Sequence, residues 1–303
     1  GRRTAQYLLE PMLFRDARLF FASFSPEDQV RAYAVYGGTP AYLRTIRPDY
    51  SLEQNILEGI LTRGSFLYDE VRFLLQQELR EPRNYFAILQ AIADGRTRLN
   101  EIKQATGIEG VTAYLDTLQQ LHLVERVVPV TEAQPQKSRR GIYYLKDHYL
   151  RFWFRYVLPN RSQLERGGGR MILESRILPE IDHFSSPVFE EICQQFLWKV
   201  GLLGGLPFVP VRVGKWWNAR EEIDLIVLGE ERAMLVECKW TGKPVGIDVL
   251  LELERKAKSV QPELERRYIH FGLCSRSGFT HDLLEHVSGR GDVMLFSLAD
   301  LVE

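Results

Sequence analysis

The chain has 303 residues, 45% hydrophobic and 26% charged, which suits a globular protein of roughly two or three domains. Its formal net charge of −1 gives no strong overall field toward nucleic acid, so any basic surface has to be local. No apolar run approaches the ~20 residues of a membrane helix, and no signal peptide is recognisable. The three cysteines are widely spaced without a CxxC pair. The cysteine pattern predicts a cytoplasmic protein and argues against a zinc ribbon or a disulfide framework. The short apolar runs predict that the protein has no membrane partner.

Residues 1–82 are predicted to form a helical segment. Ser25 and Pro26 suit the N-cap and the first position of a helix, and Gly37 and Gly38 suit its C-terminal end and a tight turn. Further apolar residues recur at helical spacing up to the end of the segment.

Residues 83–158 are predicted to form a winged helix-turn-helix. Three helical stretches are followed by a valine-rich strand, a polar hairpin and a second strand, which is the order of that fold. A generic small helical domain with a hairpin is the alternative. The hairpin holds a local basic excess at Lys137, Arg139 and Arg140, which suits contacts to DNA phosphates.

The third helix of this region would be the recognition helix. Its outward residues are expected near Thr112, Gln119 and Gln120, and none of these is cationic. Glutamine can read adenine, but Asp116 on the same face would oppose phosphate. We therefore expect weak or shape-based contacts to DNA, with a protein-interaction or packing role as the alternative.

Residues 159–170 are predicted to be a linker, because Pro159 is followed by three consecutive glycines. Residues 171–303 then follow the order αβββαβαβ. The run Ala-Met-Leu-Val at 233–236 predicts a central strand that is covered on both faces. The whole chain is thus expected to be a multidomain α+β protein with a mixed central sheet.

Charged residues mark the ends of two predicted strands in the last segment. Glu237 and Lys239 are two residues apart and therefore project from one face, and a hairpin brings Asp224 close to them. Two carboxylates and the Cys238 carbonyl suffice for Mg²⁺ or Mn²⁺. Lys239 would then assist at the phosphate, and Glu190 would add a carboxylate from a helix. Solvated ion pairs worth ~0–1 kcal/mol are the alternative interpretation.

The stretch "VGKWWNAREEIDLIVLGEERAMLVECKW", residues 213–240, resembles the DUF234 C-terminal domain of archaeal and bacterial P-loop ATPases. The αβββαβ order is similar to that of the PD-(D/E)XK nuclease superfamily. Upstream, "YGGTPAYL" and "SRRGIYYLKDHYLRFWFRY" resemble the helical lid of AAA+ or STAND-type ATPases and their winged helix. The resemblance implies metal-binding carboxylates at Asp224 and Glu237, a catalytic lysine at Lys239 and a helix glutamate at Glu190. Ile223 stands where the superfamily has proline.

The resemblance also implies an ATPase core before residue 1. No GxxxxGK[ST] motif occurs in this chain, so ATP is expected to bind only to a full-length protein that has that core. The first hypothesis is a DNA-binding protein with a divalent-metal-dependent nuclease domain, that is, a deoxyribonuclease. The second is a non-catalytic DNA-binding or assembly module with a degenerate nuclease fold. The third hypothesis is a module that dimerises the ATPase, in which case the protein would form a homo-oligomer.

Overall fold

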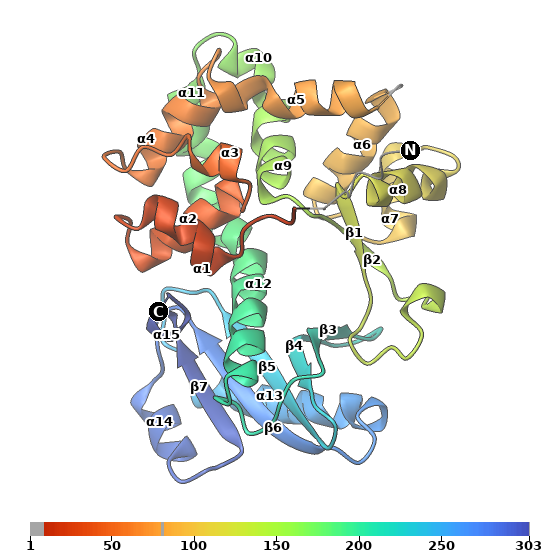
Figure 1. The fold of residues 1–303 in the computed structure, drawn as a ribbon, viewed down its shortest axis with the longest axis vertical. Helices are drawn as coiled ribbons and strands as arrows, with labels where there is room; N and C mark the ends of the chain where they lie inside the picture. The colour runs from red at the N-terminus through yellow and green to blue at the C-terminus, as the bar shows by residue number, and fades with distance from the viewer. Residues whose placement is uncertain (1–8, 80–81, 303) are drawn as a thin grey trace, which may run out of the picture.

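In the computed structural model, which describes residues 9–79 and 82–302, helices fill one half of the molecule and a five-stranded sheet fills the other (Figure 1). The long helix α12, Ile181–Leu202, runs from the helical half onto the sheet. This confirms the predicted mixed α+β class. Within the described ranges, no helix is both long and apolar enough to cross a membrane.

The first part of the helical half is built around α2, Pro26–Tyr36. As predicted, the Ser25 hydroxyl caps this helix by accepting a hydrogen bond from the Asp28 N–H (3.2 Å). Gly37 ends the helix with a φ of +69°, which favours glycine. A Cβ on Gly38 would lie 2.1 Å from the Met12 carbonyl oxygen, so this position also requires glycine. The other helices here are α1, Phe14–Ala17, α3, Pro40–Leu43, α4, Leu52–Ile56, and α5, Phe66–Glu78.

Three helices and a two-stranded antiparallel sheet come next, in the order that the sequence predicts. In the small sheet Val124 pairs with Leu145, and the loop between its strands reaches the large sheet (Figure 1). There the Val130 N–H donates to the Lys215 carbonyl (2.8 Å). The elements are α6, Pro82–Ala93, α7, Leu99–Thr106, α8, Val111–Gln120, β1, Val124–Val127, β2, Ile142–Leu145, and then α9, His148–Phe152.

Residues 159–170, where the sequence suggests a linker, fold into short helical turns packed against the first helices. Leu164 is buried, and the Arg161 guanidinium pairs with Asp69 of α5 (3.2 Å). The glycine run therefore supports close packing here, and the chain continues through it into α12. The turns include α10, Arg161–Leu164, and α11, Gly169–Ile172.

The large sheet has the strand order β3-β4-β5-β6-β7 and is mixed. Strands β3, β4 and β5 are antiparallel neighbours, whereas β5, β6 and β7 run parallel. The strands are β3, Arg212–Trp217, β4, Glu222–Leu228, β5, Arg232–Lys239, β6, Tyr268–Ser275, and β7, Val293–Ser297.

Helices cover both faces of the sheet, so β5 is buried on both sides as its apolar run predicts. Met234 and Val236 belong to a core that extends along α12 into the helical half. Ala233 and Leu235 point the other way, into a second core beneath α13. The remaining helices are α13, Ile247–Val260, α14, His281–Val287, and α15, Leu298–Val302.

Candidate active site

Asp224 and Glu237 come together where the β4–β5 ladder ends. The last pair of the ladder at this end is Leu225 with Val236. One further step in the same register sets Asp224 opposite Glu237, with both side chains on the same face of the sheet. The Asp224 Oδ2 atom accepts a hydrogen bond from the Cys238 N–H (2.7 Å). The N–H and C=O of one strand residue point to the same side, so the Cys238 carbonyl also faces Asp224. By this register, three oxygen donors lie at the same strand end.

Two lysines hold Glu237, which is only 7% exposed. Lys239 Nζ donates to its Oε1 (2.7 Å), and Lys256 Nζ from α13 donates to its Oε2 (3.2 Å). Burial acts to lower the pKa of Lys239, but the hydrogen bond to Glu237 and the charge of Asp224 raise it above its usual value. Burial, together with the Glu237 and Glu190 carboxylates, raises the pKa of Asp224 to about 7. The surroundings of Asp224 therefore disfavour its charged form.

Glu190 approaches the same strand end from α12. Its carboxylate pairs with the ammonium of Lys215 on β3. Burial opposes the charge of Lys215, yet Glu190 and Tyr144 raise the pKa of this lysine above its usual value. Sequence reasoning missed Lys215 and Lys256. The available signal for Lys215 was a cation inside a strand, next to two tryptophans.

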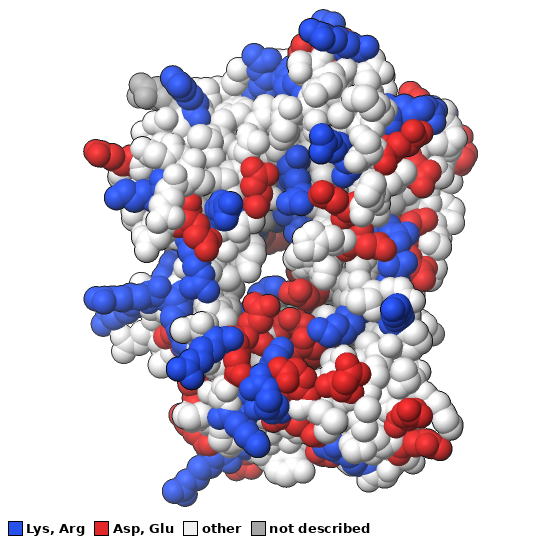
Figure 2. Space-filling model, turned by 180° about the vertical axis from the view of Figure 1, so that it is seen from behind, with Lys and Arg blue, Asp and Glu red and all other residues white. Residues whose placement is uncertain are grey.

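A cleft of about 560 Å³ opens onto Asp224 and Glu190. Glu237 and Lys239 do not line it, so a molecule in the cleft meets Asp224 and Glu190 first. Figure 2 shows acidic side chains gathered beside a hollow between the two halves, with Lys and Arg around them. The walls come from α12, from β3 to β4, and from the base of the β1–β2 hairpin, and their charged residues are Arg98, Glu190, Lys215, Arg220, Glu221, Glu222 and Asp224.

The acidic residues do not by themselves form a compact group of metal donors. Among the described residues, the one group of three or more Cys, His, Asp or Glu donors within 4.8 Å of one another is Cys193, Cys238 and Cys274. Glu237 and Glu190 are each engaged by lysine instead. The candidate divalent site therefore consists of the Asp224 and Glu237 carboxylates with the Cys238 carbonyl, and Glu190 stands beside it.

The basic residues of the hairpin divide into two groups. Lys137 and Arg139 are exposed near its tip. Arg140, also predicted to contact DNA, anchors the hairpin: its guanidinium pairs with Glu132 (2.7 Å) and Glu263 (3.1 Å). It also donates to the Trp217 carbonyl oxygen (3.1 Å).

On α8, Thr112 and Gln120 are exposed, as a DNA-reading face requires. Gln119 is partly buried, and its side-chain amide donates to the Leu115 carbonyl of the same helix (3.2 Å). None of the three lines the cleft. The structure therefore places the predicted α8 contacts apart from Asp224 and Glu190.

Comparison with known families identifies part of the chain. Residues 153–259 match the family DUF234, described as "Archaea bacterial proteins of unknown function". The chain carries a DUF234 domain. The match begins in the turn after α9, upstream of the predicted boundary at residue 171, and it includes Glu190, Asp224, Glu237 and Lys239.

A relative extends the similarity over the rest of the chain. The uncharacterized protein MJECL04 of Methanocaldococcus jannaschii is 32% identical over 307 residues, which covers 99% of this chain. The chain spans 66% of that relative's length. The similarity thus reaches beyond the DUF234 domain into both helical segments.

Two solved structures are more distant. Can2 from Sulfobacillus thermosulfidooxidans, in complex with cyclic tetra-adenylate, is 13% identical, with 75% of this chain and 52% of Can2 covered and a TM-score of 0.26. Protein VC1899 from Vibrio cholerae is 14% identical, with 75% and 53% covered and the same TM-score. Superposition at this level establishes neither a shared fold nor a shared function.

Proposed function

We propose that this chain is a divalent-metal-dependent nuclease that hydrolyses phosphodiester bonds in DNA. The observation that carries the proposal is that the β4–β5 register, continued by one pair, sets Asp224 opposite Glu237 beside a cleft that Asp224 and Glu190 line. A carboxylate whose pKa is raised by burial and by neighbouring carboxylates, as that of Asp224 is, is typical of functional sites.

The order of elements supports the same proposal. Helix α12, strands β3, β4 and β5, helix α13 and strand β6 follow the αβββαβ order of the PD-(D/E)XK nucleases. In that assignment Asp224 lies on the second strand and Glu237 and Lys239 on the third. We assign α6, α7, α8 and the β1–β2 hairpin to a winged helix that carries the DNA past the cleft.

The donor set suits a hard cation such as Mg²⁺ or Mn²⁺. Asp224, Glu237 and the Cys238 carbonyl offer oxygen ligands, and burial together with the Glu237 and Glu190 carboxylates raises the pKa of Asp224, so a cation beside Asp224 would favour its charged form. When bound, such an ion lowers the pKa of its water and neutralises charge on the scissile phosphate.

The residues of the chain have separate tasks in this proposal. Asp224 and Glu237 would hold the ion. Glu190 would orient a water molecule on the cleft side or accept a proton from it. Lys239, which is about one-third exposed, leaves Glu237 and stabilises the phosphate oxygens as their charge grows. Lys137 and Arg139 bind the DNA backbone nearby.

A second candidate is a non-catalytic DNA-binding or assembly module. The ion pairs of Glu237 with Lys239 and Lys256 favour it, because they satisfy the carboxylate without any metal. The lack of cations at Thr112, Gln119 and Gln120 favours it as well.

We also propose that the chain acts as the C-terminal part of a P-loop ATPase. The resemblance of its first segment to an ATPase lid supports this, as does the greater length of the archaeal relative. ATP would then bind to the core of the full-length protein, and the 303-residue chain is expected to show no ATP hydrolysis.

Metal binding tests the proposed function at its first step. We expect calorimetry to detect one Mn²⁺ per chain in the wild type and at least a tenfold weaker affinity in Glu237→Gln. The matched control is Glu230→Gln, at an exposed position in the turn between β4 and β5, which should bind as the wild type does. Equal affinity in all three proteins, or no binding in any, would refute the site.

A further inference from the structure

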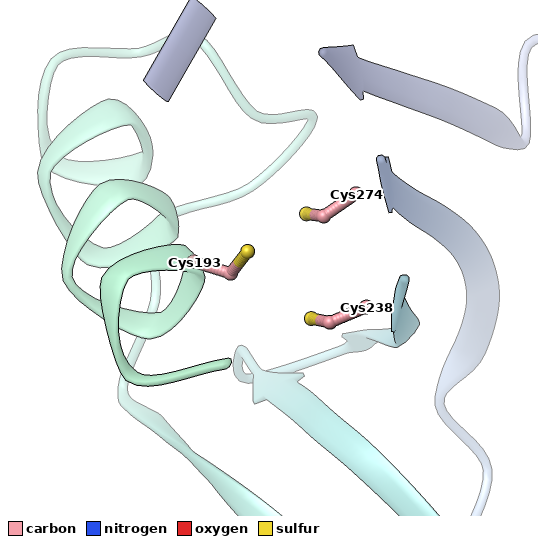
Figure 3. Close-up of side chains that lie close together, drawn as sticks. All are labelled: Cys193, Cys238 and Cys274. Carbon is pink, nitrogen blue, oxygen red and sulfur yellow. The ribbon is translucent and has the colours of Figure 1, made fainter. Parts of the chain in front are cut away.

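All three cysteines of the chain meet at one point (Figure 3). Cys193 comes from α12, Cys238 from β5 and Cys274 from β6, and their sulfur atoms lie within 4.8 Å of one another. Cys238 and Cys274 are direct partners in the register of the two parallel strands. The helix supplies the third thiol from above the sheet, so three separate elements build the cluster.

The cluster is almost completely buried, and none of its three thiols forms a disulfide bond. Cys193 and Cys274 are fully buried, and Cys238 is 6% exposed. The surrounding core is apolar and includes Leu197 and Val236. No His, Asp or Glu among the described residues joins the group within 4.8 Å. An ion held here would thus have three sulfur ligands, with no fourth His, Cys, Asp or Glu ligand from the described residues and little access for water.

The number and kind of donors select the ligand. Thiolates are soft ligands that favour Cu⁺, Zn²⁺ and iron–sulfur clusters. Structural Zn²⁺ takes four ligands in a tetrahedron, and a [4Fe–4S] cluster takes four cysteines, so three thiols complete neither. We propose that Cys193, Cys238 and Cys274 form a three-coordinate site for a soft monovalent cation, Cu⁺.

The geometry requires only a small adjustment. With metal–sulfur distances of about 2.3 Å, three ligands in a plane around one ion lie about 4 Å apart. The sulfur atoms at up to 4.8 Å reach this by side-chain rotation and a small contraction between α12 and the sheet. The expected consequence is a clamp that ties α12 to the two central parallel strands.

This site uses the Cys238 thiol, whereas the candidate active site uses the backbone carbonyl of the same residue, and it does not depend on the proposed function. Cys238 points into the core beneath α12, while Glu237 and Lys239 project from the opposite face of β5. A divalent ion with oxygen ligands and a monovalent ion with sulfur ligands would therefore occupy opposite sides of one strand. The two ions can be tested independently, because chelators distinguish them.

The decisive experiment titrates the 303-residue chain with Cu⁺ under anaerobic, reducing conditions against a chromogenic Cu⁺ chelator. We expect the wild type to bind one Cu⁺ per chain. Cys193→Ser should bind Cu⁺ with an affinity at least a hundredfold weaker, measured by competition with the chelator. The matched control is Ile192→Val, which trims a buried neighbour on α12 and leaves the three thiols intact, so it should bind as the wild type does. X-ray absorption of the loaded wild type should show three sulfur neighbours and no nitrogen or oxygen.

Three results would overturn the proposal. The first is an equal affinity for Cu⁺ in the wild type and in a folded Cys193→Ser variant. The second is a sulfur count other than three in the X-ray absorption of the wild type, a measurement that needs no variant. The third is tighter binding of Zn²⁺ than of Cu⁺ at the same thiols, which would point to a four-ligand site completed by water.

Discussion

At the scale of single residues, the central feature is the mutual influence of three carboxylates. Asp224 is partly buried, and this burial, Glu237 and Glu190 all raise its pKa. A protein that needed Asp224 only as a cap for the Cys238 N–H would gain by keeping other carboxylates away from it. Their proximity is therefore the strongest local argument for a cation at this strand end.

This argument predicts a change in titration. In Glu237→Gln the nearest negative charge is removed, so the pKa of Asp224 should fall from about 7 toward the ordinary value for aspartate. Carboxyl-detected NMR titration of the metal-free protein measures the shift. Glu230→Gln is the control and should leave the pKa unchanged. An Asp224 pKa that stays near 7 in Glu237→Gln would show that burial and Glu190 set it without Glu237.

A second residue-scale prediction concerns His148, which bonds the Glu191 carboxylate (2.8 Å). Burial acts to lower the pKa of His148, but Glu191 and Asp147 outweigh burial and Arg151, so the folded pKa is raised. The charged histidine therefore stabilises the fold below its unfolded pKa of about 6.5, and this stability is lost as pH rises through the folded pKa.

Denaturant unfolding between pH 6 and 8 measures this effect. The wild type should lose stability with rising pH, while His148→Gln should show a flatter profile over the same range. His183→Gln, at an exposed position on α12, should retain the wild-type slope. A wild-type profile with no fall above pH 6.5 would contradict the charged state of His148.

At the scale of elements, the basic residues of the β1–β2 hairpin differ in their surroundings. Arg140 fastens it to the sheet through Glu132 and Glu263, whereas Lys137 and Arg139 remain exposed. Lys137→Ala with Arg139→Ala should therefore weaken DNA binding and reduce its salt dependence by about two phosphate contacts. Fluorescence anisotropy at several salt concentrations measures both quantities.

Arg140→Ala serves as the contrasting variant. It should increase amide hydrogen exchange in the hairpin, because the anchor to Glu263 is lost, while the salt dependence of DNA binding changes little. The opposite pattern, with a large loss of salt dependence in Arg140→Ala, would mean that the guanidinium binds DNA and that the hairpin detaches from the sheet.

Several elements were predictable because their signals are local. The Ser25 cap, the glycine turn after α2 and the double-sided burial of Ala233 to Val236 follow from neighbouring residues. The antiparallel pairing that sets Asp224 opposite Glu237 follows from a short hairpin. These features need no knowledge of distant contacts.

Other features depend on tertiary packing, and sequence spacing does not reveal them. Cys193, Cys238 and Cys274 are far apart in the chain, so a search for CxxC pairs misses their convergence. Lys256 reaches Glu237 only because α13 packs beneath β5. The turns at 159–170 contain three glycines, yet their fit against α5 and its neighbours keeps them helical.

At the scale of the whole molecule, Asp182 links the helical half to the sheet. Its carboxylate accepts hydrogen bonds from Arg31 of α2 and from Arg276 beyond β6, both at 2.8 Å. Asp182→Asn should lower the free energy of unfolding by about 1 kcal/mol or less, since the carboxylate is half-exposed. Thermal unfolding measures the loss, with Asp49→Asn on the exposed loop before α4 as the control.

The same variant reports on cooperativity. If Asp182 couples the two halves, calorimetric unfolding should become broader in Asp182→Asn, because the halves begin to melt separately. A transition as sharp as that of the wild type, at an unchanged temperature, would show that the shared core along α12 suffices.

The most direct test of the account is DNA cleavage. Wild-type chain with Mn²⁺ should cut plasmid and single-stranded DNA, and both Lys239→Ala and removal of the metal with a chelator should abolish the cutting. Lys243→Ala, at an exposed lysine just after β5, should cut as the wild type does. No Mn²⁺-dependent cleavage by the wild type, or equal cleavage by Lys239→Ala, would contradict the proposal that Asp224, Glu237 and Lys239 form a nuclease site.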